Sequence, residues 1–394
     1  MPCSPEWHGP NSIGRGLERF CPIANAHRSA PGWGVRKGGP PCPPCHGCAH
    51  AGGRTRRSAP TRLCKHALAV LSAITLLAAS PVFAQSPEAT PPATASSSPW
   101  RELAPIPQAR SEFAAAVIGT RIYVAGGFDS DGRCDRFEMD TGEWHQLADL
   151  PEGVHHPGVA ALDGRIYVAG GYRLDDSREV DTVWSYDPAG DAWERRADLP
   201  TPRGALGLVA LDGKLYAVGG ARVELGGPVT GAVEVYDPAT NTWQKRAGLA
   251  TPREHLAIVA LDGRIYAVGG RANHDEGDRF AAANEVYDPA TDRWHAAAPL
   301  PVPRGGLSGV AVAGHVVVLG GERGQTAFAD VDAFDPVTNA WTALPPMPTA
   351  RHGLASAAVG DTIYAIAGST RAGTVENTPV VEALPLGAWH GGAS

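Results

Sequence analysis

Cysteine is scarce in this sequence beyond Cys64. Six of the seven cysteines lie at or before that position, and only Cys134 follows. A disulfide framework in the rest of the chain is therefore excluded. Long apolar runs are also missing, because the one that stands out, residues 67–79, is too short to span a bilayer comfortably. Glycine (48) and proline (35) occur throughout, which excludes a coiled coil.

Positive charge is scarce after Ala84. The segment up to Ala84 carries ten Lys and Arg against two Asp and Glu, whereas the remainder carries a net charge of −15. Such an acidic surface repels a phosphate backbone, so we do not expect this protein to bind nucleic acid.

The N-terminal region has the pattern of an export signal. In residues 54–84 a basic stretch precedes a short apolar core and a small residue at the end, Ala84. We therefore predict that residues 1–84 form a leader, with a translation start that lies further downstream than Met1. Cleavage near Ala84 would export the protein to the periplasm or the exterior, without a membrane span, and N-terminal sequencing of the product would test this. Residues 85–99 are predicted to be a flexible linker.

Two short motifs carry no prediction of a metal or cofactor. Cys42-Pro-Pro-Cys45-His46 has the spacing of a c-type haem attachment site, but it would be discarded with the leader. Asp129-Ser-Asp131-Gly132 hints at calcium, yet its glycine is misplaced for an EF-hand loop, so we interpret it as a turn. We predict no cofactor and no metal site.

The remainder of the chain is one unit repeated six times. Six glycine-type doublets start at positions 126, 170, 219, 269, 320 and 367. A tryptophan precedes each doublet at the same spacing every time: Trp100, Trp144, Trp193, Trp243, Trp294 and Trp341. The interval from each doublet to the next tryptophan varies instead, and is shorter from Gly126 to Trp144 than from Gly269 to Trp294. The constant interval from tryptophan to doublet and the variable interval from doublet to tryptophan together indicate a structural repeat. The loops that vary in length would then share one face.

Each unit reads as four antiparallel strands. In the third unit these are residues 206–211, a hairpin at Asp212-Gly213, residues 214–218, residues 233–236 and a strand opened by Trp243. The Gly-Gly doublets, the spaced tryptophans and Tyr-Asp-Pro at 186–188, 236–238 and 287–289 resemble the kelch repeat family. The resemblance implies an all-β, six-bladed β-propeller over residues 100–394, with tryptophan and tyrosine side chains filling the wedges between blades.

The two chain ends compete to complete the last blade. The sixth unit supplies three strands, and the segment from Trp100 copies a fourth strand. We predict that this N-terminal strand closes the ring, with the segment at Trp389 as the alternative. The small residues of the first strands, as in 113–117 and 354–359, place those strands innermost, where they would line the channel.

Five arginines stand just before the first strands and are candidates for ligand binding. They are Arg110, Arg203, Arg253, Arg304 and Arg351, with Val154 at the same position of the second unit. A ring of guanidinium groups at one mouth of the channel would suit an anionic ligand. The alternative is that each arginine pairs with an acid of a neighbouring blade or with a loop carbonyl, and the residues favour neither interpretation.

The two positions after these arginines carry candidate catalytic residues. They include Glu112, His155, His156, Glu254, His255 and His352. After ring closure Glu112, His155, His156 and His352 would lie on one side of the mouth. A histidine and a carboxylate can act as base and acid or as metal ligands, but solvated loop residues are the more common outcome.

Three functions fit this pattern. The first is an exported binding protein that presents one face and the channel mouth to a glycan, an anionic small molecule or a protein. The second is a sugar-active enzyme of the mutarotase or epimerase type, because some bacterial kelch propellers are sialic-acid mutarotases. The third, a copper oxidase similar to galactose oxidase, is disfavoured because it needs a cysteine cross-linked to a tyrosine and Cys134 is the one cysteine beyond the leader.

Overall fold

The computed structural model describes residues 98–222, 227–272 and 279–387. The chain divides into two units, Met1–Glu88 and Ala89–Ser394, and every described residue belongs to the second. The predicted leader and signal, and the linker up to residue 97, lie outside the described residues. No helix within the described part is long and apolar enough to cross a membrane.

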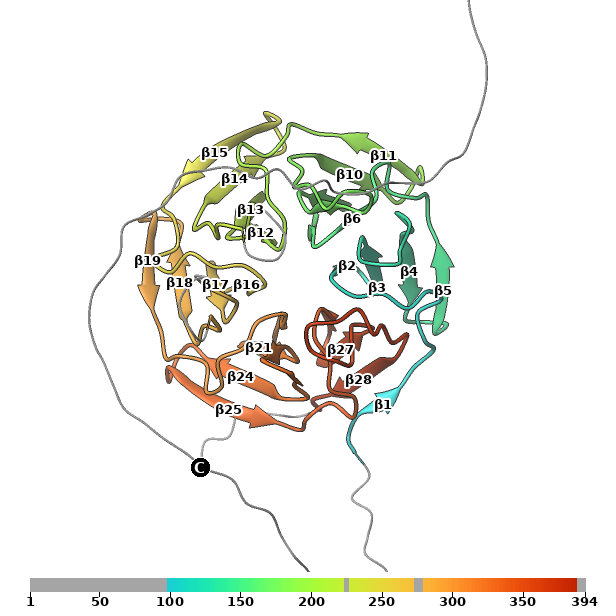
Figure 1. Cartoon of the computed structure of the whole chain (residues 1–394), viewed down its shortest axis with the longest axis vertical. Helices are drawn as coiled ribbons and strands as arrows, with labels where there is room; N and C mark the ends of the chain where they lie inside the picture. The colour runs from blue at the N-terminus through green and yellow to red at the C-terminus, as the bar shows by residue number, and fades with distance from the viewer. Residues whose placement is uncertain (1–97, 223–226, 273–278, 388–394) are drawn as a thin grey trace, which may run out of the picture. The chain divides into compact units, whose positions relative to one another are not determined.

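Six four-stranded antiparallel sheets surround a central axis in the described part of the chain (Figure 1). This arrangement confirms the predicted six-bladed β-propeller. The first strands of the blades are innermost: β2 (Ala114–Ile118), β7 (Gly158–Leu162), β12 (Gly207–Leu211), β16 (Ala257–Leu261), β20 (Ser308–Val312) and β26 (Ala355–Val359). The second strands are β3 (Arg121–Ala125), β8 (Arg165–Ala169), β13 (Lys214–Val218), β17 (Arg264–Val268), β21 (His315–Leu319) and β27 (Thr362–Ile366).

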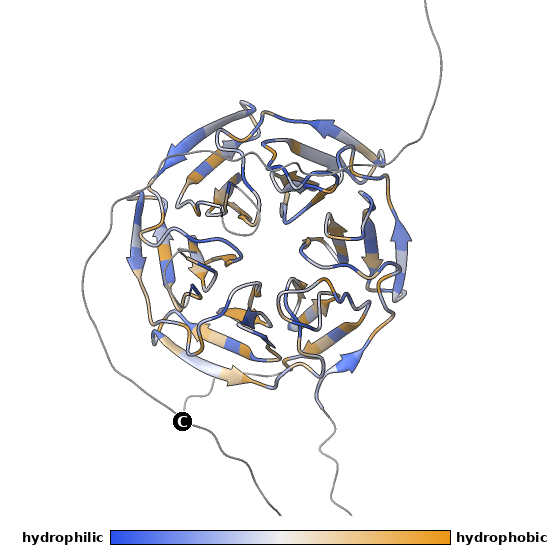
Figure 2. Ribbon diagram, in the orientation of Figure 1, coloured by the Kyte–Doolittle hydropathy of each residue, from blue (hydrophilic) through white to orange (hydrophobic). Residues whose placement is uncertain are grey.

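The third and fourth strands form the outer half of each blade. The third strands are β4 (Asp135–Glu138), β10 (Val183–Asp187), β14 (Val233–Asp237), β18 (Asn284–Asp288), β24 (Val331–Asp335) and β28 (Val381–Pro385). The fourth strands are β5 (Glu143–Gln146), β11 (Ala192–Arg195), β15 (Thr242–Arg246), β19 (Arg293–Ala296), β25 (Ala340–Leu344) and β1 (Arg101–Glu102). Most of the outermost strands are hydrophilic, because their outer faces meet solvent (Figure 2). Two short pairs, β6 (Val154–His155) with β9 (Tyr172–Arg173) and β22 (Glu322–Arg323) with β23 (Thr326–Ala327), sit beside the blades.

The N-terminal strand closes the ring, as predicted. Strand β1 pairs with β28 in the sixth blade, with Arg101 opposite Ala383 and Glu102 opposite Glu382. The first described strand of the chain and the last therefore belong to one sheet. Trp389, the alternative, lies outside the described residues.

The hydrophobic cores lie between blades rather than within them. Each of six buried clusters combines side chains from two adjacent blades. Between blades three and four, for example, Tyr216 and Val218 pack with Ile265, Ala267 and Tyr287. Because a lone blade would expose such a face on each side, the blades are stable only as a stack.

Tryptophan indoles tie the blades together at the rim. Each indole N–H donates to a backbone carbonyl of the preceding blade or of the segment that leads from it, at 2.8–3.0 Å, and the six bonds form a complete circuit. Trp100 completes the circuit by donating to Pro345. Each tryptophan from Trp144 to Trp341 also packs against the aromatic residue opposite it on the third strand, with ring centroids 5.0–5.2 Å apart. The predicted role of tryptophan and tyrosine as wedges is confirmed.

Closure by β1 predicts that Trp100 contributes strongly to stability. Trp100 is 6% exposed, and its replacement by alanine removes both the packing and the bond to Pro345. We expect Trp100→Ala to lower the free energy of unfolding by about 3–5 kcal/mol, measured by urea denaturation. Val337→Ala is the control, because Val337 is 93% exposed and should change stability little. Equal stability of both variants would contradict closure by β1.

Candidate functional site

The five candidate arginines lie inside the blades and not around the channel. Each side chain is fully buried. Each guanidinium pairs with a carboxylate at the third strand of its own blade: Arg110 with Asp135, Arg203 with Glu234, Arg253 with Glu285, Arg304 with Asp332, and Arg351 with Glu382. The predicted ring of guanidinium groups at the mouth is therefore wrong. The alternative, ion pairing, is what the structure has, although the acid comes from the same blade rather than a neighbouring one.

Backbone carbonyls take up further guanidinium N–H groups. Arg203 Nε and Arg304 Nε donate to the carbonyls of Gly219 and Gly320, both at 2.8 Å. Burial lowers the pKa of Arg203, while the charge of Glu234 opposes that shift. These two contacts hold the doublets at Gly219 and Gly320 against the arginines that begin their blades.

Blade two has neither the buried arginine nor its acidic partner. Val154 stands at its arginine position. Trp184 pairs with Val168 on β8 just as Glu234 pairs with Ala217 on β13. Trp184 therefore occupies the position of the acid in blade two. A buried ion is costly without its partner, so a blade without the arginine cannot keep the acid.

A closed ring of backbone hydrogen bonds surrounds the axis where the inner strands begin. We call this ring the collar: Glu112, His156, Ala205, His255, Gly306 and Gly353. The N–H of each collar residue donates to the carbonyl of the collar residue in the neighbouring blade, at 2.7–3.0 Å. All six residues have φ between 53° and 65°, the left-handed region. The collar brings residues of distant blades close to one point.

The collar places two histidines beside one carboxylate. His156 Nε2 lies 3.2 Å from Glu112 Oε2, and His255 Nε2 lies 3.6 Å from the same oxygen. His352, one residue before the collar, has its Nε2 3.9 Å from Glu112 Oε1. Gly353 makes room for this carboxylate, because an added Cβ there would fall 2.5 Å from Glu112 Oε1.

A buried polar layer covers the collar. We call it the closing cluster: His155, Glu254, Arg271, Glu322 and His352, each less than 7% exposed. Arg271 joins the two carboxylates, with Nε 2.8 Å from Glu254 and Nη1 3.2 Å from Glu322. His352 Nε2 lies 3.6 Å from Glu322. In the described part of the chain, this end of the channel therefore holds buried side chains where we expected an open mouth.

Contacts within these layers fix the imidazole rings. His156 Nδ1 shares a hydrogen bond of 2.6 Å with His155 Nδ1, and His255 Nδ1 bonds to the carboxylate of Glu254. Phe128 stacks on His155 with ring centroids 4.1 Å apart. Burial lowers the pKa of His155 to about 4 and also lowers the pKa of His156 and His352. These three imidazoles are therefore neutral at pH 7.

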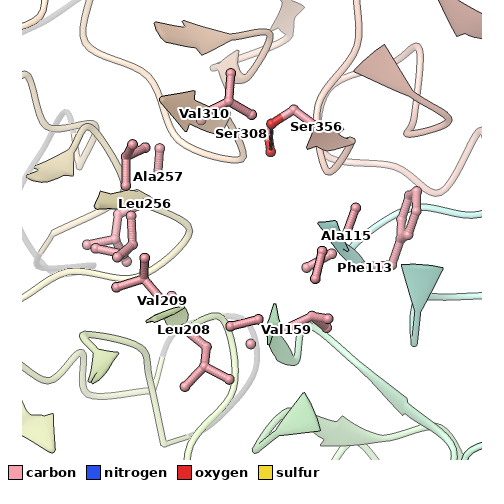
Figure 3. Close-up of a pocket in the computed structure, with 18 of the residues that line it drawn as sticks. Phe113, Ala115, Val159, Leu208, Val209, Leu256, Ala257, Ser308, Val310 and Ser356 are labelled. Atoms are coloured by element: carbon pink, nitrogen blue, oxygen red, sulfur yellow. Dashed lines mark hydrogen bonds between the residues drawn. The ribbon is translucent and has the colours of Figure 1, made fainter. Parts of the chain in front are cut away.

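On the side of the collar away from the closing cluster lies an axial cavity of about 520 Å³. The inner strands line it, as predicted, largely with alanine, valine and leucine such as Ala115 and Leu208 (Figure 3). Ser308 and Ser356 add hydroxyls that bond to each other at 2.6 Å. Glu112, His156 and His255 of the collar form its polar floor.

The cavity is accessible from the opposite end, where hairpin turns join the first and second strands. The wall residues near those turns are half-buried: Val117, Ala161, Ala210, Ala260, Ala311 and Ala358. The closing cluster at the other end is buried throughout. A guest would therefore enter from the hairpin end and meet the collar last.

All six candidate catalytic residues lie at or next to the collar. The structure brings Glu112, His156 and His352 together, as expected from blades six, one and two. It also adds His255 and Glu254 of blade four, because the collar is narrow enough for opposite blades to meet. Sequence reasoning missed Arg271 and Glu322. Their signal was available, since each directly follows a Gly-Gly doublet.

Comparison with known proteins identifies the family. A model of the KLHDC2/KLHL20/DRC7 kelch-repeats domain matches residues 93–248 and 235–368, well over half of the chain. The chain is a kelch-repeat protein. A solved structure of YjhT matches with a TM-score of 0.63 and 16% identity, covering 71% of this chain and 95% of that chain, which shows a shared fold. No curated protein matches the sequence.

Cys134 lies apart from the site of this kelch propeller. It is buried in the core between blades one and two, with Tyr123, Val154 and Tyr186 in the same cluster. Burial raises the pKa of its thiol to about 12. Its surroundings are those of a core residue rather than of a cross-link at the cavity floor.

The buried ion pairs predict a specific pattern of stability. Arg203→Met leaves Glu234 charged and buried without its cation, and we expect the free energy of unfolding to fall by about 3–5 kcal/mol. Arg203→Met combined with Glu234→Met should recover most of this loss, because blade two already has an apolar pair at these positions. Urea denaturation measures both.

A surface pair provides the control. The Arg121 side chain, which pairs with Glu138, is 52% exposed, so Arg121→Met should cost under about 1 kcal/mol. An Arg203→Met variant as stable as this control would contradict a structural role for the buried arginines.

Proposed function

We propose that this kelch propeller is an exported binding protein whose guest is a small molecule held in the axial cavity. The supporting observation is the form of that cavity, with aliphatic walls, a polar floor at Glu112, His156 and His255, and access from the hairpin end. Pockets of this kind combine apolar burial with a few polar groups that fix orientation. Export rests on the predicted signal at residues 54–84.

The walls restrict the class of guest. Ser308 and Ser356 supply hydroxyls, but Ala115, Val159 and Val310 offer aliphatic carbon only (Figure 3). Each innermost strand pairs on one side only, so its free edge also presents backbone N–H and C=O groups to the cavity. We therefore favour a small guest that combines apolar surface with hydrogen-bonding groups, one of which reaches the floor. A protein partner on one face is the broader alternative for a kelch propeller.

Filling the cavity should abolish binding. Ala115 is half-buried on β2 and faces the cavity, so Ala115→Phe places a ring where the guest would lie. We expect small molecules that raise the melting temperature of the wild-type protein in a thermal-shift screen to have no effect on this variant. Ala192→Phe on the exposed outer strand β11 is the matched control and should respond as wild type does. A shift that survives in Ala115→Phe would place the binding site elsewhere.

A second candidate function is a sugar mutarotase. The observation that favours it is the contact between Glu112 and the neutral imidazole of His156 at 3.2 Å, a pair that could move a proton at an anomeric centre. Proton NMR should then show anomer exchange of sialic acid faster than in buffer, and Glu112→Gln should slow it. A rate equal to the buffer blank would exclude this function.

A further inference from the structure

Carboxylate and imidazole groups gather around the collar. Glu112 belongs to the collar, and Glu254 and Glu322 lie in the closing cluster on either side of Arg271. The imidazoles of His156 and His255 both approach Glu112. Carboxylate oxygens and imidazole nitrogens are the side-chain groups that bind transition-metal ions most often in proteins.

We propose that Glu112, His156 and His255 bind a divalent transition-metal ion of the zinc class at the floor of the axial cavity. Glu112 Oε2 lies 3.2 Å from His156 Nε2 and 3.6 Å from His255 Nε2, and all three donor atoms lie within 4.8 Å of one another. Zinc binds nitrogen and oxygen at about 2.0–2.2 Å, which puts the donors of a tetrahedral site roughly 3.3 Å apart. Small side-chain movements would therefore complete the site.

The chemistry of the donors selects the metal. Two imidazole nitrogens and one carboxylate oxygen suit zinc and its neighbours in the first transition row rather than calcium or magnesium, which prefer oxygen. Among the described residues this is the one group of three or more such side chains close enough to share an ion.

Groups behind the ligands present the correct nitrogen to the ion. His255 Nδ1 donates a hydrogen bond to the carboxylate of Glu254, which leaves the Nε2 lone pair of His255 directed toward Glu112. His156 Nδ1 shares its hydrogen bond with His155 Nδ1, so His156 Nε2 is the nitrogen that faces Glu112. Arg271 in turn holds Glu254 at 2.8 Å. A carboxylate behind a metal-bound histidine is a recurrent device that orients the ring and strengthens its bond to the metal.

The collar makes the site rigid and leaves one position open. All three proposed ligands are collar residues, so their backbones are fixed by the closed hydrogen-bond ring. The same three residues line the cavity. A fourth coordination position would therefore face the guest, whose polar end would complete the tetrahedron. This last step rests on the proposed function, whereas metal binding itself does not.

Metal binding can be measured on the full chain after treatment with a chelator. Cysteines near the N-terminus could also bind metal, so every protein should carry Cys42→Ser and Cys45→Ser as a common background. Titration with Co²⁺ gives visible bands typical of tetrahedral coordination, and charge-transfer bands in the near ultraviolet reveal any remaining thiolate ligand. Titration calorimetry with Zn²⁺ gives the stoichiometry and the affinity.

We expect one equivalent of Zn²⁺ that depends on the collar. Glu112→Gln and His255→Gln should each remove it, and Glu254→Gln should keep the stoichiometry but weaken the affinity by about 10–100-fold. His295→Gln, at an exposed histidine on β19, is the matched control and should bind as the background protein does. Circular dichroism should show that each variant retains the fold.

Two results would overturn the proposal: no bound equivalent in the folded background protein, or an equivalent that survives in Glu112→Gln and His255→Gln. The cavity variant keeps the two proposals separate. Ala115→Phe should still bind Zn²⁺ while it loses the guest, so failure of metal binding and failure of guest binding are distinguishable.

Discussion

Ring closure is the constraint on which the rest of this propeller depends. Each blade exposes apolar faces that only a neighbour can cover, and three circuits of hydrogen bonds hold neighbours in place. The indoles form the outer circuit and the collar forms the inner one. Between them, the second glycine of each doublet donates to the carbonyl at the arginine position of the next blade, at 2.9–3.0 Å. The repeated residues of the sequence therefore act mainly at joints between blades.

The collar shows how a symmetric backbone can carry an asymmetric site. All six collar residues share one left-handed conformation and one bonding pattern, so the backbone places few demands on side-chain identity. Glycine or alanine occupies three positions, and glutamate and histidine occupy the other three. The small residues leave space into which the larger ones extend, as Gly353 does for Glu112. The polar floor therefore depends on which blades carry glutamate or histidine at the collar position.

The periodic parts of the fold could be predicted from sequence. Six doublets at a constant distance from six tryptophans implied six blades, and the copy of a fourth strand at Trp100 implied closure by the N-terminus. Both inferences depend on spacing, which a repeated unit preserves. The small residues of the first strands likewise identified the channel lining.

The direction of side chains could not be predicted in the same way. Arg203 stands next to the channel in sequence, but its side chain turns into the blade because Glu234 and the Gly219 carbonyl lie there. The acid was visible in β14, as a charged residue within an apolar strand, but nothing local to Arg203 indicated their contact. His255 was missed as a partner of Glu112 for a related reason, since the contact crosses the ring between blades that are not neighbours.

The pairing of β1 with β28 has a consequence for how the chain reaches its native state. Strand β1 is made long before β28, so β1 has no partner until β28 follows, while the blades before the sixth can already assemble. Until then, the first blade and the most recently made blade each expose an apolar face that no neighbour covers. During synthesis the molecule therefore passes through an open arc, and its vulnerability to aggregation is concentrated at this one seam.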